Sequence, residues 1–356
     1  MNRRELLYLI AGGFAVATIG STGRAYDTKK VKKSRLGIAD FSFNNRLRAE
    51  RAGKMKVNLG DPLNFLDYCH NIGAGGIQMN IGIRDEAYTH KIRQKTEQYE
   101  MFIEGSTSLP RDQSSAEKFE AAVRSAKLAG AGIVRTAIGG RRYEQFDRAK
   151  QFRAFSERTK RSLQFAEPVV AKHRVRLTIE NHKDWRIDQM LDLVKSLSSE
   201  YLGVCVDTGN SFALLEDPIT VVEAYAPYAF SVHLKDMAVA EYEDGFLIAD
   251  VPLGQGVLDL ARIIEILRKA NPGINFSLEM ATRDALKVPC LTEKYWVTFE
   301  NVPGYDLART LRYVRDNASA KQNLPKVNHL PIDKLVKIEE ANIKQCLDFA
   351  NEHLDL

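Results

Sequence analysis

Short apolar runs alternate with amphipathic stretches along most of this chain. Eight of the runs predict strands, at residues 36–39, 76–79, 100–104, 132–137, 174–180, 202–207, 229–233 and 275–279. Stretches between them carry apolar residues at helical spacing and predict helices, among others at residues 62–73, 145–170, 187–197 and 258–270. Strands that alternate with helices pair in parallel through crossover connections. Eight such units in about 250 residues predict a (β/α)8 TIM barrel over residues 35–280.

A doubly wound open sheet is the alternative fold. The sequence disfavours it, because no G-x-G-x-x-G motif follows the first strand and polar residues recur at the ends of the strands.

Two helix starts have capping signals. Asp61 precedes Pro62, the order expected of an N-cap followed by the first helical residue. Ser114 and Glu117 have the spacing of a capping box, ahead of a helix that carries Phe119 on its apolar face.

Two segments exceed what a barrel requires. Residues 237–256 lengthen the seventh unit and are predicted to form a loop. Residues 281–356 are predicted to be a helical extension that packs on the barrel or on a partner subunit of a homo-oligomer. The apolar positions that mark its two helices are Leu307, Leu311, Val314, Val336, Ile343, Leu347, Ala350 and Leu354.

The N-terminus has the layout of a secretory signal peptide. Arg3 and Arg4 precede an apolar run at residues 6–19, and a small-x-small cleavage site follows at residues 23–25. We therefore predict a twin-arginine-like signal peptide at residues 1–25, a basic spacer at 26–34, and export to the periplasm. The apolar run is shorter than the ~20 residues that a membrane span needs, so we expect no stable span after processing.

Composition and charge further narrow the class of protein and the kinds of partner that the sequence allows. The 356 residues are 44% hydrophobic and 27% charged, as in an ordinary globular protein. The net charge is +5, from 51 basic and 46 acidic side chains spread along the chain, which argues against a nucleic-acid partner. The four cysteines are far apart and show no CxxC spacing, so no disulfide framework is expected.

Polar residues end four successive strands of the predicted barrel: Glu180, Asp207, His233 and Glu279. Barrel strands bring their C-terminal ends to one mouth, where barrel enzymes place their active sites. Three carboxylates there would repel one another unless a cation lay among them. Three oxygen ligands and one imidazole suit a single Mn²⁺, Mg²⁺, Co²⁺ or Zn²⁺ ion.

Each of these four residues also has a simpler interpretation. Glu180 could be a loop charge, Asp207 part of a turn, and His233 a hydrogen-bonded core residue. Glu279 could pair with Arg283. Four independent accidents at successive strands are less economical than one metal site, so we favour the metal site.

The same strand ends carry a family resemblance. The segments Ile179-Glu180-Asn181-His182, Val206-Asp207-Thr208-Gly209-Asn210, Val232-His233-Leu234-Lys235-Asp236, Gly254-Gln255-Gly256 and Ser277-Leu278-Glu279 resemble the xylose isomerase-like TIM barrel superfamily, over about residues 35–280. That superfamily holds sugar isomerases, ketose 3-epimerases, inosose dehydratases and endonuclease IV-type enzymes. The resemblance implies that Glu180, Asp207, His233 and Glu279 are metal ligands. In its epimerase branch, the two residues Glu180 and Glu279 are also the catalytic acid and base.

Several residues depart from the family pattern, and these departures help to decide which branch of the superfamily the chain resembles. Ketose epimerases commonly have a histidine where this chain has Asn210, whereas His182 and the segment with Lys235 are closer to the inosose dehydratase-like branch. Lys235 could hold an oxyanion or a substrate carboxylate, or be a surface charge. Endonuclease IV-type enzymes have histidines at the second and third strand ends. Gln78 and Glu104 stand near those positions here, which disfavours DNA repair.

The resemblance implies a divalent-metal-dependent isomerase or epimerase that acts next to the carbonyl of a sugar or keto-sugar through an enediolate. A dehydratase or lyase that uses the same site is the first alternative, and a non-catalytic sugar-binding barrel is the second. The residues expected to bind substrate are His182, Asn210, Lys235, Glu104, Arg135 and Arg283, and Gln78 is a further candidate for the pocket.

Overall fold

The structure is a computed structural model that describes residues 34–318 and 324–356. The predicted signal peptide and all but the last residue of the basic spacer lie outside the described residues. Within the described residues, no helix is both long enough and apolar enough to cross a membrane.

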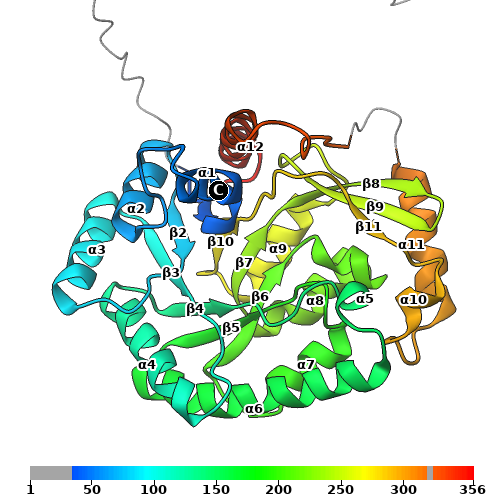
Figure 1. The fold of residues 1–356 in the computed structure, drawn as a ribbon, viewed down its shortest axis with the longest axis horizontal. Coiled ribbons are helices and arrows are strands. Elements are labelled where there is room, and N and C mark those ends of the chain that lie inside the picture. The colour runs from blue at the N-terminus through cyan, green and yellow to red at the C-terminus, as the bar shows by residue number, and fades with distance from the viewer. Residues whose placement is uncertain (1–33, 319–323) are drawn as a thin grey trace, which may run out of the picture. The chain divides into compact units, whose positions relative to one another are not determined.

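Eight parallel strands close into a barrel (Figure 1). Their order around the barrel is β1-β10-β7-β6-β5-β4-β3-β2, and each neighbouring pair is parallel. The strands are β1 (Gly37–Ala39), β2 (Gly76–Met79), β3 (Phe102–Ser106), β4 (Ile133–Thr136), β5 (Arg176–Glu180), β6 (Leu202–Asp207), β7 (Ala229–Leu234) and β10 (Asn275–Leu278). The predicted (β/α)8 barrel is confirmed, and the open sheet is excluded.

Helices surround the barrel (Figure 1). They are α1 (Asn44–Arg51), α2 (Pro62–Asn71), α3 (Glu86–Tyr99), α4 (Gln113–Leu128), α5 (Arg142–Gln145), α6 (Ala149–His173), α7 (Ile187–Lys195), α8 (Pro218–Tyr225) and α9 (Leu260–Ala270). Asp61 caps α2 as predicted, and its Oδ1 accepts from Leu63 N at 3.1 Å. The pattern gave no prediction for α3.

Two helix starts were predicted at the wrong residue. The capping box of α4 is formed by Asp112 and Ser115, not by Ser114 and Glu117. Asp112 Oδ1 accepts from Ser115 N at 2.9 Å, because an aspartate caps as well as a serine and lets the helix begin earlier. The helix predicted over residues 145–170 is α6, which begins at Ala149 and not at Gln145, because Phe146 is extended and Gln145 ends the separate helix α5.

Residues 237–256 do not form a loop as predicted. Most of them lie in a hairpin of β8 (Asp236–Tyr242) and β9 (Gly245–Val251), to which β11 (Leu286–Val288) adds a third antiparallel strand. Val239, Phe246 and Ile248 of the hairpin pack in a second apolar cluster, separate from the main core. This burial stabilises the small sheet on one side of the barrel (Figure 1).

The C-terminal extension is helical, as predicted, apart from β11. Its helices are α10 (Glu293–Trp296), α11 (Gly304–Asn317) and α12 (Ile332–His353). α12 packs against α1, far from it in sequence (Figure 1). All four cysteines are buried and unpaired, in agreement with the absence of a disulfide framework from the sequence.

A buried carboxylate joins α12 to α1. Glu339 accepts hydrogen bonds from the backbone N–H groups of Asn45 (2.8 Å) and Arg46 (2.9 Å), in the first turn of α1. The N-cap residue of α1, Phe43, supplies no side-chain acceptor. Glu339 therefore takes the place of the missing cap and leaves no unpaired donor there.

The same corner fixes the chain around Glu279. Ser42 Oγ donates to Leu278 O (2.9 Å) and accepts from Met280 N (3.0 Å), so it holds the residues on both sides of Glu279. Asn45 Nδ2 donates to Thr282 O at 2.8 Å. The extension thus supports α1, and α1 with the turn before it supports the end of β10.

We expect Glu339→Ala to destabilise the protein. The change leaves two buried backbone N–H groups without an acceptor, at about 1–3 kcal/mol each. Lys337→Ala, at an exposed position of the same helix, is the control and should change the free energy of unfolding by no more than about 0.5 kcal/mol. Chemical denaturation measures both. Equal unfolding free energies for the two variants would contradict the capping role of Glu339.

Candidate metal centre

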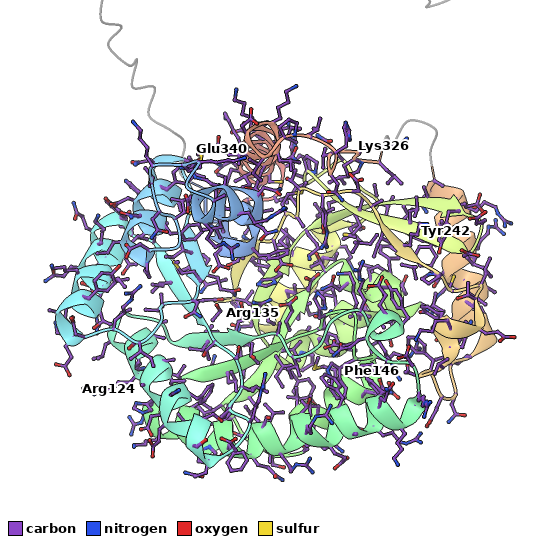
Figure 2. All side chains as sticks on the ribbon, viewed as in Figure 1. Arg124, Arg135, Phe146, Tyr242, Lys326 and Glu340 are labelled. Atoms are coloured by element: carbon purple, nitrogen blue, oxygen red, sulfur yellow. The ribbon has the colours of Figure 1, made fainter. Side chains whose placement is uncertain are left out.

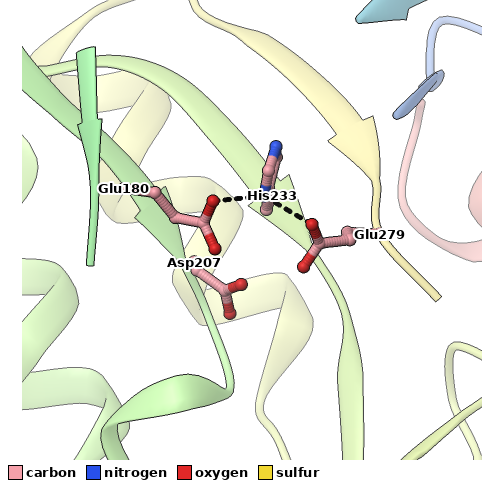
Figure 3. A group of neighbouring side chains, drawn as sticks. All are labelled: Glu180, Asp207, His233 and Glu279. Carbon is pink, nitrogen blue, oxygen red and sulfur yellow. Dashed lines mark ion pairs between the residues drawn. The ribbon is translucent and has the colours of Figure 1, made fainter. Parts of the chain in front are cut away.

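Four side chains meet at the C-terminal mouth of the barrel (Figure 3). Glu180 and Asp207 are the last residues of β5 and β6, His233 lies near the end of β7, and Glu279 directly follows β10. One ligand atom from each lies within 4.8 Å of the others, and all four residues are buried. The convergence predicted from the four strand ends is therefore what the structure shows.

The ring of His233 is held with one nitrogen toward the carboxylates. Its Nε2 lies 2.6 Å from Gln78 Oε1, and Gln78 Nε2 donates to Glu104 Oε2 at 2.9 Å. Because the amide NH₂ of Gln78 faces the carboxylate, its oxygen accepts from Nε2–H of His233. The lone pair of Nδ1 is then directed to Glu279 Oε1 (3.3 Å) and Glu180 Oε2 (3.8 Å), the two contacts drawn in Figure 3.

Burial also keeps this ring neutral. It lowers the pKa of His233 to about 3, against the opposing effect of Glu279. A neutral imidazole with a free Nδ1 lone pair is the form that binds a metal ion.

Glu104 lies deeper in the barrel than predicted for a substrate-binding residue. Its Oε1 accepts from Asn275 at the start of β10 (3.1 Å), and its Oε2 accepts from Ser231 Oγ (2.5 Å) and from Gln78. Burial raises the pKa of the Glu104 carboxyl, and these three donors partly offset it. Glu104 and Gln78 therefore form the floor beneath the site, and they orient His233 rather than line the mouth.

Two cations lie among the three carboxylates. Lys235 Nζ is 2.7 Å from Asp207 Oδ2 and 2.6 Å from Glu279 Oε2. Arg135 Nη2 pairs with Glu180 and lies 3.9 Å from Glu279 Oε1. Figure 2 labels Arg135 near the middle of the ring of strands. Burial alone would raise the pKa of Glu279, but the positive charges of Lys235 and Arg135 hold it well below its ordinary value.

Two of the simpler interpretations are wrong. Lys235 is not a surface charge, since only 3% of it is exposed. Arg283 does not pair with Glu279; its Nη2 lies 3.4 Å from Asp250 Oδ2, on the hairpin strand β9. Asp250 Oδ1 in turn lies 3.9 Å from Lys235 Nζ, so the hairpin brings a fourth carboxylate to the edge of the site.

Asn181 fixes the backbone of Asp207. Its Oδ1 accepts from Asp207 N (2.7 Å), and its Nδ2 donates to Asp207 O (3.0 Å). Asn210 Nδ2 donates to Asn181 O at 3.3 Å and its Oδ1 accepts from Lys183, so Asn210 ties together the loops after β5 and β6. These are positioning contacts, in which the amide of Asn181 continues the pairing of the two strands.

Asp236 explains the Gly254-Gln255-Gly256 segment. Its carboxylate accepts from the backbone N–H groups of Gly254 (3.0 Å), Gly256 (2.8 Å) and Leu258 (3.1 Å). A Cβ atom on Gly256 would overlap the Asp236 carboxylate. This part of the family pattern therefore shapes the loop after the hairpin and does not reach the site.

Sequence reasoning missed three charged residues near the mouth. Asp40 directly follows β1 and interacts electrostatically with Arg135 and Glu279, so the strand-end rule could have found it. Lys183 is buried beside His182, and both residues line a pocket. Asp250 carried no signal, because its segment was predicted to be a loop.

The four converging residues fit a divalent ion. Glu180 Oε1 and His233 Nδ1 are buried and have no hydrogen-bond partner in the part of the chain that the structure describes. Buried polar atoms without partners are rare, and here both atoms carry lone pairs that can bind a metal ion. Together with Asp207 and Glu279 they form the oxygen-rich donor set that Mn²⁺, Mg²⁺, Co²⁺ or Zn²⁺ prefers.

Solved structures share this fold at low sequence identity. The 3-keto-D-glucoside 4-epimerase of E. coli is 12% identical, with a TM-score of 0.52 over 80% of this chain and 100% of that one. The IOLI protein with a bound zinc atom is 15% identical, with a TM-score of 0.50 over 80% of this chain and 98% of that one. At this level of identity, the similarity to these two structures shows a shared fold.

Sequence relatives match a shorter part of the chain at higher identity. The 3-oxo-isoapionate decarboxylase of Pectobacterium atrosepticum is 29% identical over 133 residues, which are 36% of this chain and 48% of that protein. The chain thus spans about half the length of this curated relative. A family model described as "Xylose isomerase-like TIM barrel" matches residues 66–311. Because that match covers more than half of the sequence, the chain belongs to the xylose isomerase-like TIM barrel family.

Proposed function

We propose that this protein is a divalent-metal-dependent isomerase or epimerase that acts next to the carbonyl of a sugar or keto-sugar through an enediolate intermediate. The observation that carries the proposal is the convergence of Glu180, Asp207, His233 and Glu279 within 4.8 Å. An ion held by these four would polarise the substrate carbonyl and stabilise the negative charge that develops on its oxygen.

Glu180 and Glu279 are the proposed base and acid. They project from β5 and β10, between which β6 and β7 lie in the barrel, so they approach the site from two sides. The cations paired with them, Arg135 and Lys235, favour their ionised forms. One carboxylate would remove the proton from the carbon beside the carbonyl and become protonated. The other, once it has taken up a proton from solvent, would return that proton, to the opposite face in an epimerisation.

A lyase reaction is the second candidate. Loss of CO₂ from a 3-oxo acid leaves an electron pair on the carbon beside the carbonyl, as proton removal does, so both reactions need the same stabilisation of an enolate. The 29% identity to a 3-oxo-isoapionate decarboxylase over 133 residues favours this candidate specifically. Dehydration would follow from the same intermediate if a hydroxyl group lay on the next carbon.

The remaining alternative is a binding protein rather than an enzyme, namely a non-catalytic sugar-binding barrel. It requires neither a metal ion nor an ionised base at the mouth. The cluster of buried carboxylates, two of which pair with the cations Arg135 and Lys235, supports the enzyme instead. Export through a twin-arginine-like signal is a separate proposal that rests on residues 1–25 of the sequence alone.

The metal site predicts a binding stoichiometry and its loss. Elemental analysis of the purified wild type should find about one divalent ion per chain. The double variant Glu180→Gln, Asp207→Asn removes two ligand charges and should hold none. Gln78→Met removes the acceptor of His233 Nε2–H and should weaken metal binding about 10–100-fold in titration calorimetry.

Glu241→Gln is the matched control. Glu241 is an exposed carboxylate on β8, and it forms a surface ion pair with Arg315 at 3.3 Å. It should bind metal like the wild type. Retention of the ion in the double variant would contradict the assignment of the ligands.

Solvent exchange separates the candidate reactions. Keto-sugars and 3-oxo sugar acids are incubated with the protein in deuterated water. Deuterium should enter at the carbon beside the carbonyl, and NMR and mass spectrometry identify the labelled position and the products. A stereoisomer or an aldose indicates an epimerase or isomerase, and release of CO₂ or water indicates a lyase. Glu279→Gln should slow the reaction by about 10²–10⁴-fold. A wild type that binds these sugars without exchange or product would be a binding protein, and the enzyme proposal would be wrong.

A further inference from the structure

A pocket of about 510 Å³ opens beside the metal centre. Three parts of the chain line it: the loop after β4 with α5, the loop after β5, and the segment from Arg283 to β11. Its volume suits part of a sugar-sized molecule. The extension beyond the barrel therefore contributes directly to a cavity at the mouth.

The charged lining of this pocket is mostly basic. Arg141, Lys183 and Arg283 line it, and Glu144 is the acidic residue among the lining side chains, which leaves an excess of two positive charges. Glu144 pairs with Arg141 at 2.7 Å, in a pair that is about one-third to one-half exposed. His182 adds a ring whose Nδ1 is buried without a hydrogen-bond partner among the described residues.

Lys183 lacks a counter-ion of its own. It is only 2% exposed, and its Nζ donates to the neutral Oδ1 of Asn210. Among the described residues, Lys183 forms no ion pair within 4 Å, and Asp207 and Asp250 act on its charge only from a longer distance. Burial accordingly lowers the pKa of Lys183 to about 8, with Lys235 as the next cause. A buried ammonium group gains most from an anionic partner.

The pocket and the metal centre adjoin. Asp250 faces both, with Oδ2 at 3.4 Å from Arg283 and Oδ1 at 3.9 Å from Lys235, which in turn contacts two of the metal ligands. A substrate whose carbonyl lies at the four ligands would therefore extend its far end toward Arg141, Lys183 and Arg283.

We propose that this pocket binds an anionic substituent of the substrate, a carboxylate or a phosphate, at a position remote from the reacting carbonyl. The inference rests on the proposed function, because it takes the metal centre as the place of the reaction. Guanidinium groups present paired donors to such anions, and the Lys183 ammonium supplies a buried charge. The substrate class is thus narrowed from keto-sugars to sugar acids or sugar phosphates.

Binding of three related ketoses tests the pocket without any need for turnover. The probes are D-fructose, which is neutral, 5-keto-D-gluconate, which carries a carboxylate, and D-fructose 6-phosphate. Titration calorimetry on the full chain, with and without MnCl₂, should give at least about tenfold tighter binding for one or both anions than for D-fructose. The tighter of the two identifies the anion.

The preference should depend on the pocket arginines. The double variant Arg141→Gln, Arg283→Gln should lose most of it, and Lys183→Met should do the same if that buried change is tolerated, which circular dichroism would show. Arg124→Gln, at an exposed arginine of the outer helix α4, is the control and should keep the preference (Figure 2).

Equal affinity for the three ketoses, undetectable binding of both anions, or an unchanged preference in the arginine double variant would each overturn the anion pocket. None of these outcomes depends on metal content or on solvent exchange. Failure of the pocket and failure of the proposed reaction are therefore distinguishable.

Discussion

Buried carboxylates that face one another repel, and the mouth of this barrel gathers three of them within 4.8 Å. Much of the surrounding structure offsets that repulsion. Arg135 and Lys235 lie among the carboxylates, and His233 is kept neutral so that its Nδ1 lone pair, rather than a third positive charge, faces them. The Gln78–Glu104 pair beneath the ring fixes that orientation. A divalent ion is the further partner that such a donor set calls for.

The parts of the chain outside the barrel also act on this site. Glu339 of α12 caps α1, and Ser42 just before α1 holds both neighbours of Glu279. The β8–β9 hairpin brings Asp250 between the metal ligands and the basic pocket. The extension and the hairpin therefore support the site and line its edge, while the barrel supplies the four converging side chains themselves.

The barrel and the convergence of the four strand-end residues were predictable because each depends on a local pattern repeated along the chain. Residues such as Asp207 and Glu279 lie at the C-terminal ends of their strands, so their convergence at one mouth follows from the parallel topology. The hairpin was not predictable in this way, since its third strand lies in sequence beyond β10. The depth of Glu104 was not predictable either. How far up the barrel a side chain lies depends on the stagger of the strands, which no single strand reveals. Lys183 carried no signal because one lysine after a strand usually faces solvent.

The most direct test of the metal centre is anomalous diffraction from crystals of the full chain grown with MnCl₂, recorded at the manganese absorption edge. We expect one anomalous peak bounded by Glu180, Asp207, His233 Nδ1 and Glu279, with the His233 Nε2 still bonded to Gln78. A structure that has no peak there, with Lys235 alone bridging Asp207 and Glu279, would contradict it.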